Sequence, residues 1–347
     1  MSENVDTTLA PKKIRPPSGR VSRLFESKWL GWVALAIAVA APFVNATPYA
    51  LNIMTTAAIF VLLASGLNIV VGYCGLLDLG YIAFMAVGAY TAGIVAKAFE
   101  LPLLFTVPVV LVMTILAGLI IGAPTLRLRS DYLAIVTLGF GEITRITANN
   151  LAITGGPSGI FGIPGILKIG DFDFQQPAVF YYVTIFVVAG FVLAAARLGK
   201  SRLGRAWRFV REDEDAAEAM GIHTYKVKLL AYIFGAIWGG IGGVLFAGHL
   251  SAVAPTSFVF LQSALVLMAV VLGGMGNMRG VVIGALVISL LPELLRDLAE
   301  YRYLAFGVLL IVVMLFRPQG FWPARGYEPE RKPAEEREAV AVAGEQR

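Results

Sequence analysis

The sequence is poor in charge, cysteine and histidine, and each shortage argues against a class of protein. Charged residues make up 15% of the 347-residue chain, against about a quarter in soluble domains. The single cysteine, Cys74, excludes an internal disulfide. The two histidines, His223 and His249, lie too far apart in the chain to indicate a metal site by themselves. The net charge of +5 is not gathered into a basic stripe with aromatics, so nucleic-acid binding is not indicated.

What the chain has in abundance is apolar sequence, at 58% of all residues. The apolar residues come in blocks, most of them of about the 17–25 residues that cross a bilayer as a helix. Only helices satisfy the backbone of such segments in lipid. We therefore predict an all-α, polytopic transmembrane bundle of about 8–10 helices, with windows at 29–47, 50–71, 79–96, 102–123, 132–149, 178–196, 229–249, 258–273, 281–295 and 302–316.

Basic residues orient this bundle, because lysine and arginine are enriched in cytoplasmic loops. With ten crossings, a cytoplasmic tail at 1–28 precedes a membrane domain at 29–316, and a second cytoplasmic tail follows at 317–347. The longest loop, 197–228, is then cytoplasmic as well. All but five of the 28 basic residues fall on the cytoplasmic side, the exceptions being Lys97, Lys168, Arg296, Arg302 and, within a span, Arg145.

Three segments depart from simple spans. The window 132–149 carries Glu142 and Arg145, which are costly in lipid unless they are paired or face water. Their i,i+3 spacing places them on one helix face, where they can pair. The short windows 258–273 and 281–295 could be broken or re-entrant. The Gly- and Pro-rich segment 150–177 is longer than a turn but too small for a receptor domain.

The stretch "GLNIVVGYCGLLDLGYIAFMAVGAYTAG", residues 66–93, combines six glycines with one acid, Asp78. Glycines in membrane helices allow close packing, and they also allow helices to break where backbone lines a cavity. The cluster around Asp78 favours a break that forms part of a translocation path or its gate. Asp78 could equally cap a helix at a cytoplasmic turn. The candidate path residues are Asn68, Asp78, Tyr81, Tyr90, Glu142 and Arg145.

The sequence contains no nucleotide-binding motif that could power uphill transport. "GKS" at Gly199–Ser201 suggests a phosphate loop, but that motif needs a glycine where Ala194 stands. ATP hydrolysis, if used, belongs to another chain, so we expect no catalytic residue, no metal site and no cofactor in this one. An ion-coupled secondary transporter or channel remains an alternative. An intramembrane enzyme would need clustered His, Asp or Ser pairs in the spans, and only the Glu142–Arg145 pair is found.

The loop 197–228 contains a strong helix-forming run, Arg208–Met220. Carboxylates near its start suit the positive end of the helix dipole, and Gly221 stands where a left-handed cap would end it. The loop therefore predicts a short, capped helix that presents small side chains to a partner protein. The alternative is an amphipathic helix lying on the membrane. The small residues expected on its surface are Ala216, Ala217 and Ala219.

Within that loop, "DAAEAMG" resembles the coupling motif of bacterial ABC importer permeases, Glu-Ala-Ala, three residues, then Gly, with Asp215 in place of Glu. Residues 66–90, "TGGPSGIFGIP" and "GGMGNMRGVVIGA" resemble the branched-chain amino acid permeases, LivM-type, over roughly residues 50–320. Urea and short-amide permeases share the overall pattern, but "LLDLGY" favours amino acids. The resemblance implies a coupling surface made of Glu214, Asp215, Ala216, Ala217, Glu218 and Gly221.

The same resemblance implies a complex in the bacterial inner membrane and an ABC importer permease fold. The partners would be a homologous second permease, two ATPase subunits that bind ATP and Mg²⁺, and a periplasmic solute-binding protein. The substrates would be leucine, isoleucine and valine. ATP would close the ATPase dimer, and the coupling helix would pass that movement to the paired permeases.

Overall fold

The computed structural model describes residues 47–126, 130–169, 172–294 and 320–322, together with positions 40, 304, 307, 308, 311 and 315. The two predicted cytoplasmic tails lie almost wholly outside the described residues. So do most of the first and last predicted spans, 29–47 and 302–316.

The described part is built from eight long helices that match the eight remaining apolar windows, so the all-α prediction is confirmed. Among the described residues, five helical segments are long and apolar enough to cross a membrane: Pro48–Tyr73, Leu103–Thr125, Pro177–Lys200, Thr224–Leu250 and Pro255–Gly273. The long helices are α3 (Pro48–Leu67, continued by the π-helix η1, Asn68–Tyr73), α4 (Ile82–Ala98), α5 (Leu103–Thr125), α6 (Ser130–Asn150), α7 (Pro177–Lys200), α10 (Thr224–Leu250), α11 (Phe260–Gly273) and α12 (Met278–Leu294).

Helix α10 is the central element and packs against α3, α4 and α5. Its glycines let backbones touch. A Cβ on Gly88 of α4 would lie 2.3 Å from the Gly240 carbonyl oxygen, and one on Gly243 would lie 2.2 Å from the Met85 oxygen. Small residues at such crossings are what close packing between membrane helices requires.

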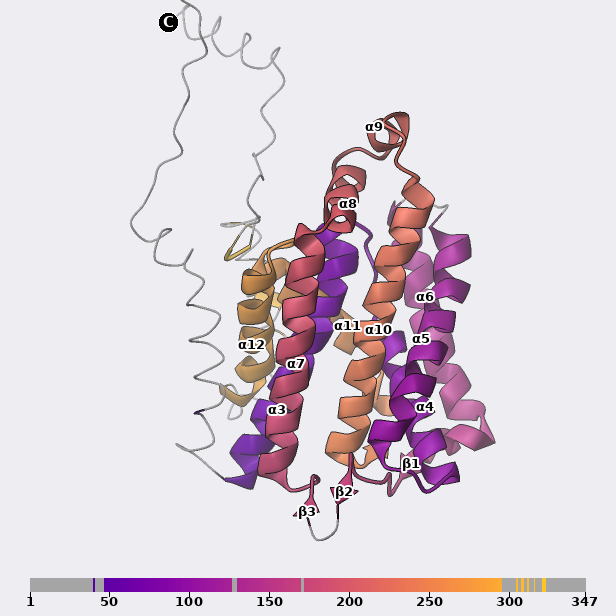
Figure 1. The fold of residues 1–347 in the computed structure, drawn as a ribbon, viewed down its shortest axis with the longest axis vertical. Helices are drawn as coiled ribbons and strands as arrows, with labels where there is room; N and C mark the ends of the chain where they lie inside the picture. Colours follow the sequence, from indigo (N-terminus) through magenta and orange to yellow (C-terminus); the bar gives the residue numbers. More distant parts are fainter. Residues whose placement is uncertain are drawn as a thin grey trace, which may run out of the picture. The chain divides into compact units, whose positions relative to one another are not determined.

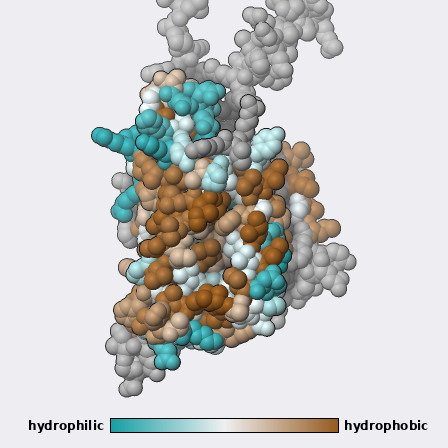
Figure 2. Space-filling model, turned by 90° about the vertical axis from the view of Figure 1, so that its right-hand side faces the viewer, coloured by the Kyte–Doolittle hydropathy of each residue, from teal (hydrophilic) through white to brown (hydrophobic). Residues whose placement is uncertain are grey.

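The outer helices expose apolar side chains, as expected of surfaces that meet lipid or other membrane subunits. Phe186 on α7 is 82% exposed, and Ile120 on α5 and Ile135 on α6 are similarly uncovered. Figure 2, which views the right-hand side of Figure 1, shows apolar side chains across the middle of that face and polar ones gathered near its upper end.

The short elements lie at opposite ends of the helices (Figure 1). At one end, α8 (Arg202–Glu212) and α9 (Glu214–Ala219) connect α7 to α10. At the other end, the segment 150–177 forms short turns and strands rather than a domain. These are the 3₁₀ turns Ala152–Thr154 and Gly156–Ser158 and the strands β1 (Ile160–Phe161), β2 (Lys168–Ile169) and β3 (Phe172–Asp173), with a further turn Pro255–Ser257 and strand β4 (Ala252–Val253) after α10.

The strands pair in two small antiparallel ribbons. Strand β1 pairs with β4, with Ile160 opposite Val253, and β2 pairs with β3. The first ribbon ties the segment before α7 to the end of α10, although the two are about ninety residues apart in the sequence.

The helix predicted over Arg208–Met220 was wrong in one respect, because the run is divided into α8 and α9. Asp213 interrupts it with an extended backbone, φ −156° and ψ 111°. Its Oδ1 accepts the N–H of Ala216 at 2.9 Å. Aspartate competes for backbone donors in this way and starts a new helix instead of continuing the old one.

Candidate functional site

The predicted break in the Gly66–Gly93 stretch is confirmed. After η1 ends at Tyr73 the chain is non-helical until Ile82, and Gly75 takes a left-handed conformation with φ +76°. We call residues 74–81 the break segment. Glycines in and just before this segment also make room for neighbours. A Cβ on Gly80 would lie 1.8 Å from the Thr137 carbonyl oxygen of α6, and one on Gly72 would lie 1.9 Å from Asn68 Oδ1.

Asp78 lies wholly buried inside the break segment. Its Oδ1 accepts the N–H of Gly80 at 2.9 Å, which is the local turn by which aspartate prepares a helix start. Its Oδ2 has no hydrogen-bond partner among the described residues, although the Tyr232 hydroxyl lies beside the carboxyl group. Asp78 closes a turn ahead of α4 but does not cap that helix, because the N-cap position of α4 is Tyr81 and receives no side-chain hydrogen bond. No solute reaches the buried Asp78 side chain in this conformation.

Asn68, Tyr81 and Tyr90 are also buried. Asn68 Oδ1 accepts the N–H of Gly276 at 2.9 Å and so joins η1 to the turn between α11 and α12. Tyr81 donates its hydroxyl to the Gly235 carbonyl at 3.0 Å. Asn68 and Tyr81 therefore hold helices of the subunit together in this conformation, while Tyr90 packs against the ring of Phe258. None of these buried side chains faces an open path.

Glu142 and Arg145 form the ion pair that their spacing predicts, with an N–O distance of 2.8 Å and about one third of each side chain exposed. They lie apart from the buried set, on a helix that otherwise presents apolar residues outward. An ion pair with this exposure is costly against lipid, so α6 faces water or another protein at this level.

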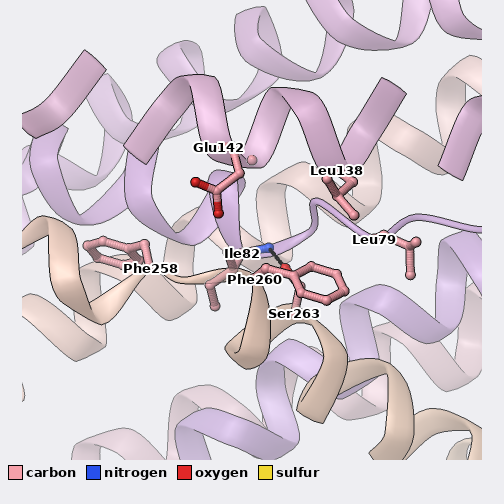
Figure 3. A pocket seen from close by; sticks show the side chains of 8 residues that line it. Leu79, Ile82, Leu138, Glu142, Phe258, Phe260 and Ser263 are labelled. Carbon is pink, nitrogen blue, oxygen red and sulfur yellow. Dashed lines mark hydrogen bonds between the residues drawn. The ribbon is translucent and has the colours of Figure 1, made fainter. Parts of the chain in front are cut away.

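Glu142 borders a small hollow between α6, the start of α4 and the start of α11 (Figure 3). The hollow has a cavity volume of only about 10 Å³, roughly the space for one water molecule and far below the 300–1,000 Å³ typical of ligand pockets. Ser263 Oγ accepts the N–H of Ile82 at 3.0 Å across it. Two non-helical stretches meet here, the break segment and the residues before Phe260. The lining residues are Leu79, Ile82, Leu138, Gly141, Glu142, Phe258, Phe260 and Ser263.

Sequence reasoning missed Phe258, Phe260 and Ser263, because they lie at the start of a window that is almost wholly apolar. The one sequence feature that pointed to this site was the shortness of that window, which suggested a broken helix. Helix α11 indeed starts only at Phe260, after the turn Pro255–Ser257. Broken helices that meet in this way are typical of solute sites in transporters.

At the other candidate surface, α9 is a short helix fixed at both ends. Asp213 caps its start, and Gly221, with φ +85°, ends it. Gly221 N–H bonds to the Glu218 carbonyl and Ile222 N–H to the Ala217 carbonyl, at 2.9 and 3.1 Å. This is the Schellman pattern of helix ends, so the predicted glycine cap is confirmed.

The predicted coupling residues do not all face outward. Asp215, Ala216, Glu218 and Gly221 are exposed, as is Ala219. Ala217 is wholly buried, so its expected surface position was wrong. Glu214 pairs with the ammonium of Lys228 at the start of α10, and that lysine side chain is only 8% exposed. Ala217 and Glu214 therefore anchor α9 to the membrane helices.

A junction forms where α8, α9 and α10 approach the break segment. Trp207 of α8 is buried and donates its Nε1–H to the Val227 carbonyl at 2.8 Å. Cys74, just beyond η1, is 2% exposed, and burial raises the pKa of its thiol to about 12. The Lys228 and Glu214 charges lie close enough to act on that thiol. This junction could not be predicted from the sequence, because its members come from four separate segments.

The comparisons with known proteins agree on one family. A family model described as branched-chain amino acid transport system / permease component matches residues 49–316. The chain is 40% identical to the high-affinity branched-chain amino acid transport system permease protein LivM of Escherichia coli, over 83% of this chain and 73% of that protein. No solved structure matches.

Two further relatives broaden the picture. The permease protein BraD of Pseudomonas aeruginosa is 27% identical over 78% of this chain and 93% of its own length. The permease protein LivH of Escherichia coli is 34% identical over 122 residues, 35% of this chain and 39% of its own. The chain is a multi-pass membrane protein that belongs to the family of permease components of branched-chain amino acid transport systems.

Proposed function

We propose that this chain is one membrane subunit of an ATP-driven importer of leucine, isoleucine and valine in the bacterial inner membrane, with both termini in the cytoplasm. The single observation that carries the proposal is α9, an exposed helix capped at both ends and anchored underneath, in a chain of this permease family. Such a helix is suited to receive force from a partner that supplies the energy. The transport names of the relatives favour amino acids over urea or short amides.

The second permease subunit would be a homologue of this chain. The likeness to both LivM and LivH, two permease proteins of one species, supports a pair of related membrane subunits. The Glu142–Arg145 pair, about one third exposed, supports α6 as part of the surface turned to that subunit or to a shared path. The hollow beside Glu142 is then a candidate part of the path, which in this conformation is closed.

The remaining partners would be two ATPase subunits and a periplasmic solute-binding protein. Their ATP and Mg²⁺ supply the energy that this chain does not provide. The exposed carboxylates of Asp215 and Glu218 and the small Ala216 would contact the ATPase. Selectivity would come from the binding protein, so the path itself need not be strongly selective.

The test is reconstitution of the chain with a second permease, the ATPases and the binding protein in liposomes. We expect uptake of labelled leucine that requires ATP on the side of the membrane where the ATPases lie. Uptake should be lost when the phosphate-loop lysine of the ATPase is replaced. Labelled urea serves as the control solute. Leucine uptake by the permeases alone, driven by an ion gradient and indifferent to ATP, would contradict the proposal.

A further inference from the structure

The last turn of α8 contacts the point where α3 and η1 end. Arg211 donates from Nη1 to the carbonyl oxygen of Gly72, at 2.5 Å. The last carbonyls of a helix have no partner within it and carry partial negative charge. A guanidinium group is well suited to such an end, because it adds a charge-assisted hydrogen bond. Arg211 therefore connects a short helix of the α8–α9 connection directly to the start of the break.

Arg211 makes a second contact three residues further along, at Gly75. A Cβ on Gly75 would lie 2.7 Å from Arg211 Cγ and 3.2 Å from its Cβ. The backbone of the break segment therefore rests on the aliphatic part of the arginine side chain. Gly75 is needed here both for this close approach and for its left-handed conformation. Arg211 thus contacts both the end of η1, at Gly72, and the break segment, at Gly75.

Arg211 is also close to α9. Only Glu212 and the capping residue Asp213 separate it from Glu214, and no flexible linker lies between them. Glu214 is in turn fixed to Lys228 at the start of α10. A force applied to the exposed face of α9 therefore has two rigid routes into the membrane part, through α8 to the break segment and through Lys228 to α10.

We propose that Arg211 is a positioning residue that passes movement of α9 to the break segment and thereby links the ATPase cycle to the opening of the path. The inference rests on the proposed function and adds the element that carries its coupling. Arg211 contacts neither solute nor nucleotide in this scheme. Its effect is to keep the end of η1 and the last turn of α8 moving together.

The experiment measures ATP hydrolysed per leucine imported, in the reconstituted complex. In Arg211→Ala we expect ATP hydrolysis to continue while uptake falls, so that the ratio rises at least about fivefold, the lower end of typical coupling between sites. The matched control is Arg205→Ala, which removes an exposed arginine from the same helix without touching the break segment. We expect its ratio to stay at the wild-type value.

An Arg211→Ala complex with the wild-type ratio would overturn the inference. A lower amount of assembled complex changes uptake and hydrolysis together and leaves the ratio unaltered, so a purely structural role gives that same result. A wild-type complex without ATP-dependent uptake would instead count against the proposed function.

A second measurement needs no substitution that could impair folding. Cys74 lies between Gly72 and Gly75 and is the only cysteine of this chain, so its alkylation by N-ethylmaleimide reports on the break segment. We expect its rate in the wild-type complex to differ at least about fivefold between the nucleotide-free state and a state trapped with ATP by a hydrolysis-deficient ATPase. Equal rates in the two states would refute the inference whatever becomes of Arg211→Ala.

Discussion

Gly80 and Gly221 are both positions where the structure favours glycine, but for different reasons. Gly80 has an ordinary backbone conformation, and its added Cβ would lie 1.8 Å from the Thr137 carbonyl oxygen. Gly221 has φ +85° and no atom within 4 Å of an added Cβ. At Gly80 the break segment thus needs glycine for space, whereas at Gly221 the end of α9 needs it for conformation. The first region is fixed by its own neighbours, whereas the second leaves its surface free for a partner.

The largest effect should come from filling the space at Gly80. Gly80→Ala places a methyl group against helix backbone that cannot rotate away, so we expect a loss of about 3 kcal/mol of stability. Thermal unfolding of the detergent-purified subunit measures it. The matched control is Gly139→Ala on the facing helix α6, where an added Cβ meets nothing. We expect that variant to be as stable as the wild type or more so.

The next effect should come from Gly221→Ala, which strains a left-handed residue without any clash. We expect a loss of about 1–2 kcal/mol, with a folded subunit and the membrane helices unchanged. Co-purification with the ATPase subunits is the sharper measurement, because the cap holds the exposed face of α9 in place. Gly221→Asn, which tolerates the same conformation, should restore binding. Equal destabilisation by Gly80→Ala and Gly221→Ala would remove the contrast between the two regions.

A smaller effect is expected at Asp78, where substitution distinguishes a turn-forming role in the break segment from a contact with solute. Asp78→Ala removes the acceptor for Gly80 N–H and should cost about 1 kcal/mol. Asp78→Asn keeps an oxygen there and should be nearly as stable as the wild type. If the residue only closes the turn before α4, leucine uptake follows the amount of assembled protein in both variants. A well-assembled Asp78→Asn complex without uptake would instead indicate a direct role in the path.

The last prediction changes no residue. The pKa of Cys74 is raised to about 12 by burial, so its thiol stays protonated at neutral pH. Since the thiolate is the reactive form, alkylation should be slow at pH 7 and still rising steeply at pH 9.5. An exposed thiol with a pKa near 8.5 would already have levelled off. A plateau near pH 9 would show that the start of the break segment is open to solvent.

The sequence predicted the helices and the break well, because both follow from local composition. Apolar length gave the described spans, and three glycines around one acid marked the break. It could not predict which backbones those glycines face, since Thr137 and Gly276 are distant in the chain. The acids Glu212 to Asp215 look equivalent in sequence, and only geometry makes Asp213 a cap and Glu214 a partner of Lys228. Ala217 was misplaced because six residues are too few to reveal a buried face.

The direct backbone contact between α4 and α10 at Gly88, Gly240 and Gly243 has a mechanical consequence. Two helices seated so closely cannot slide without a clash, so they behave as one stiff lever. Its near end carries Lys228, beneath α9, and its far end continues into β4, which is bound to β1. A tilt begun at Lys228, beneath α9, would therefore reach Ala252–Val253 at the other end of α10, with little lost to internal bending.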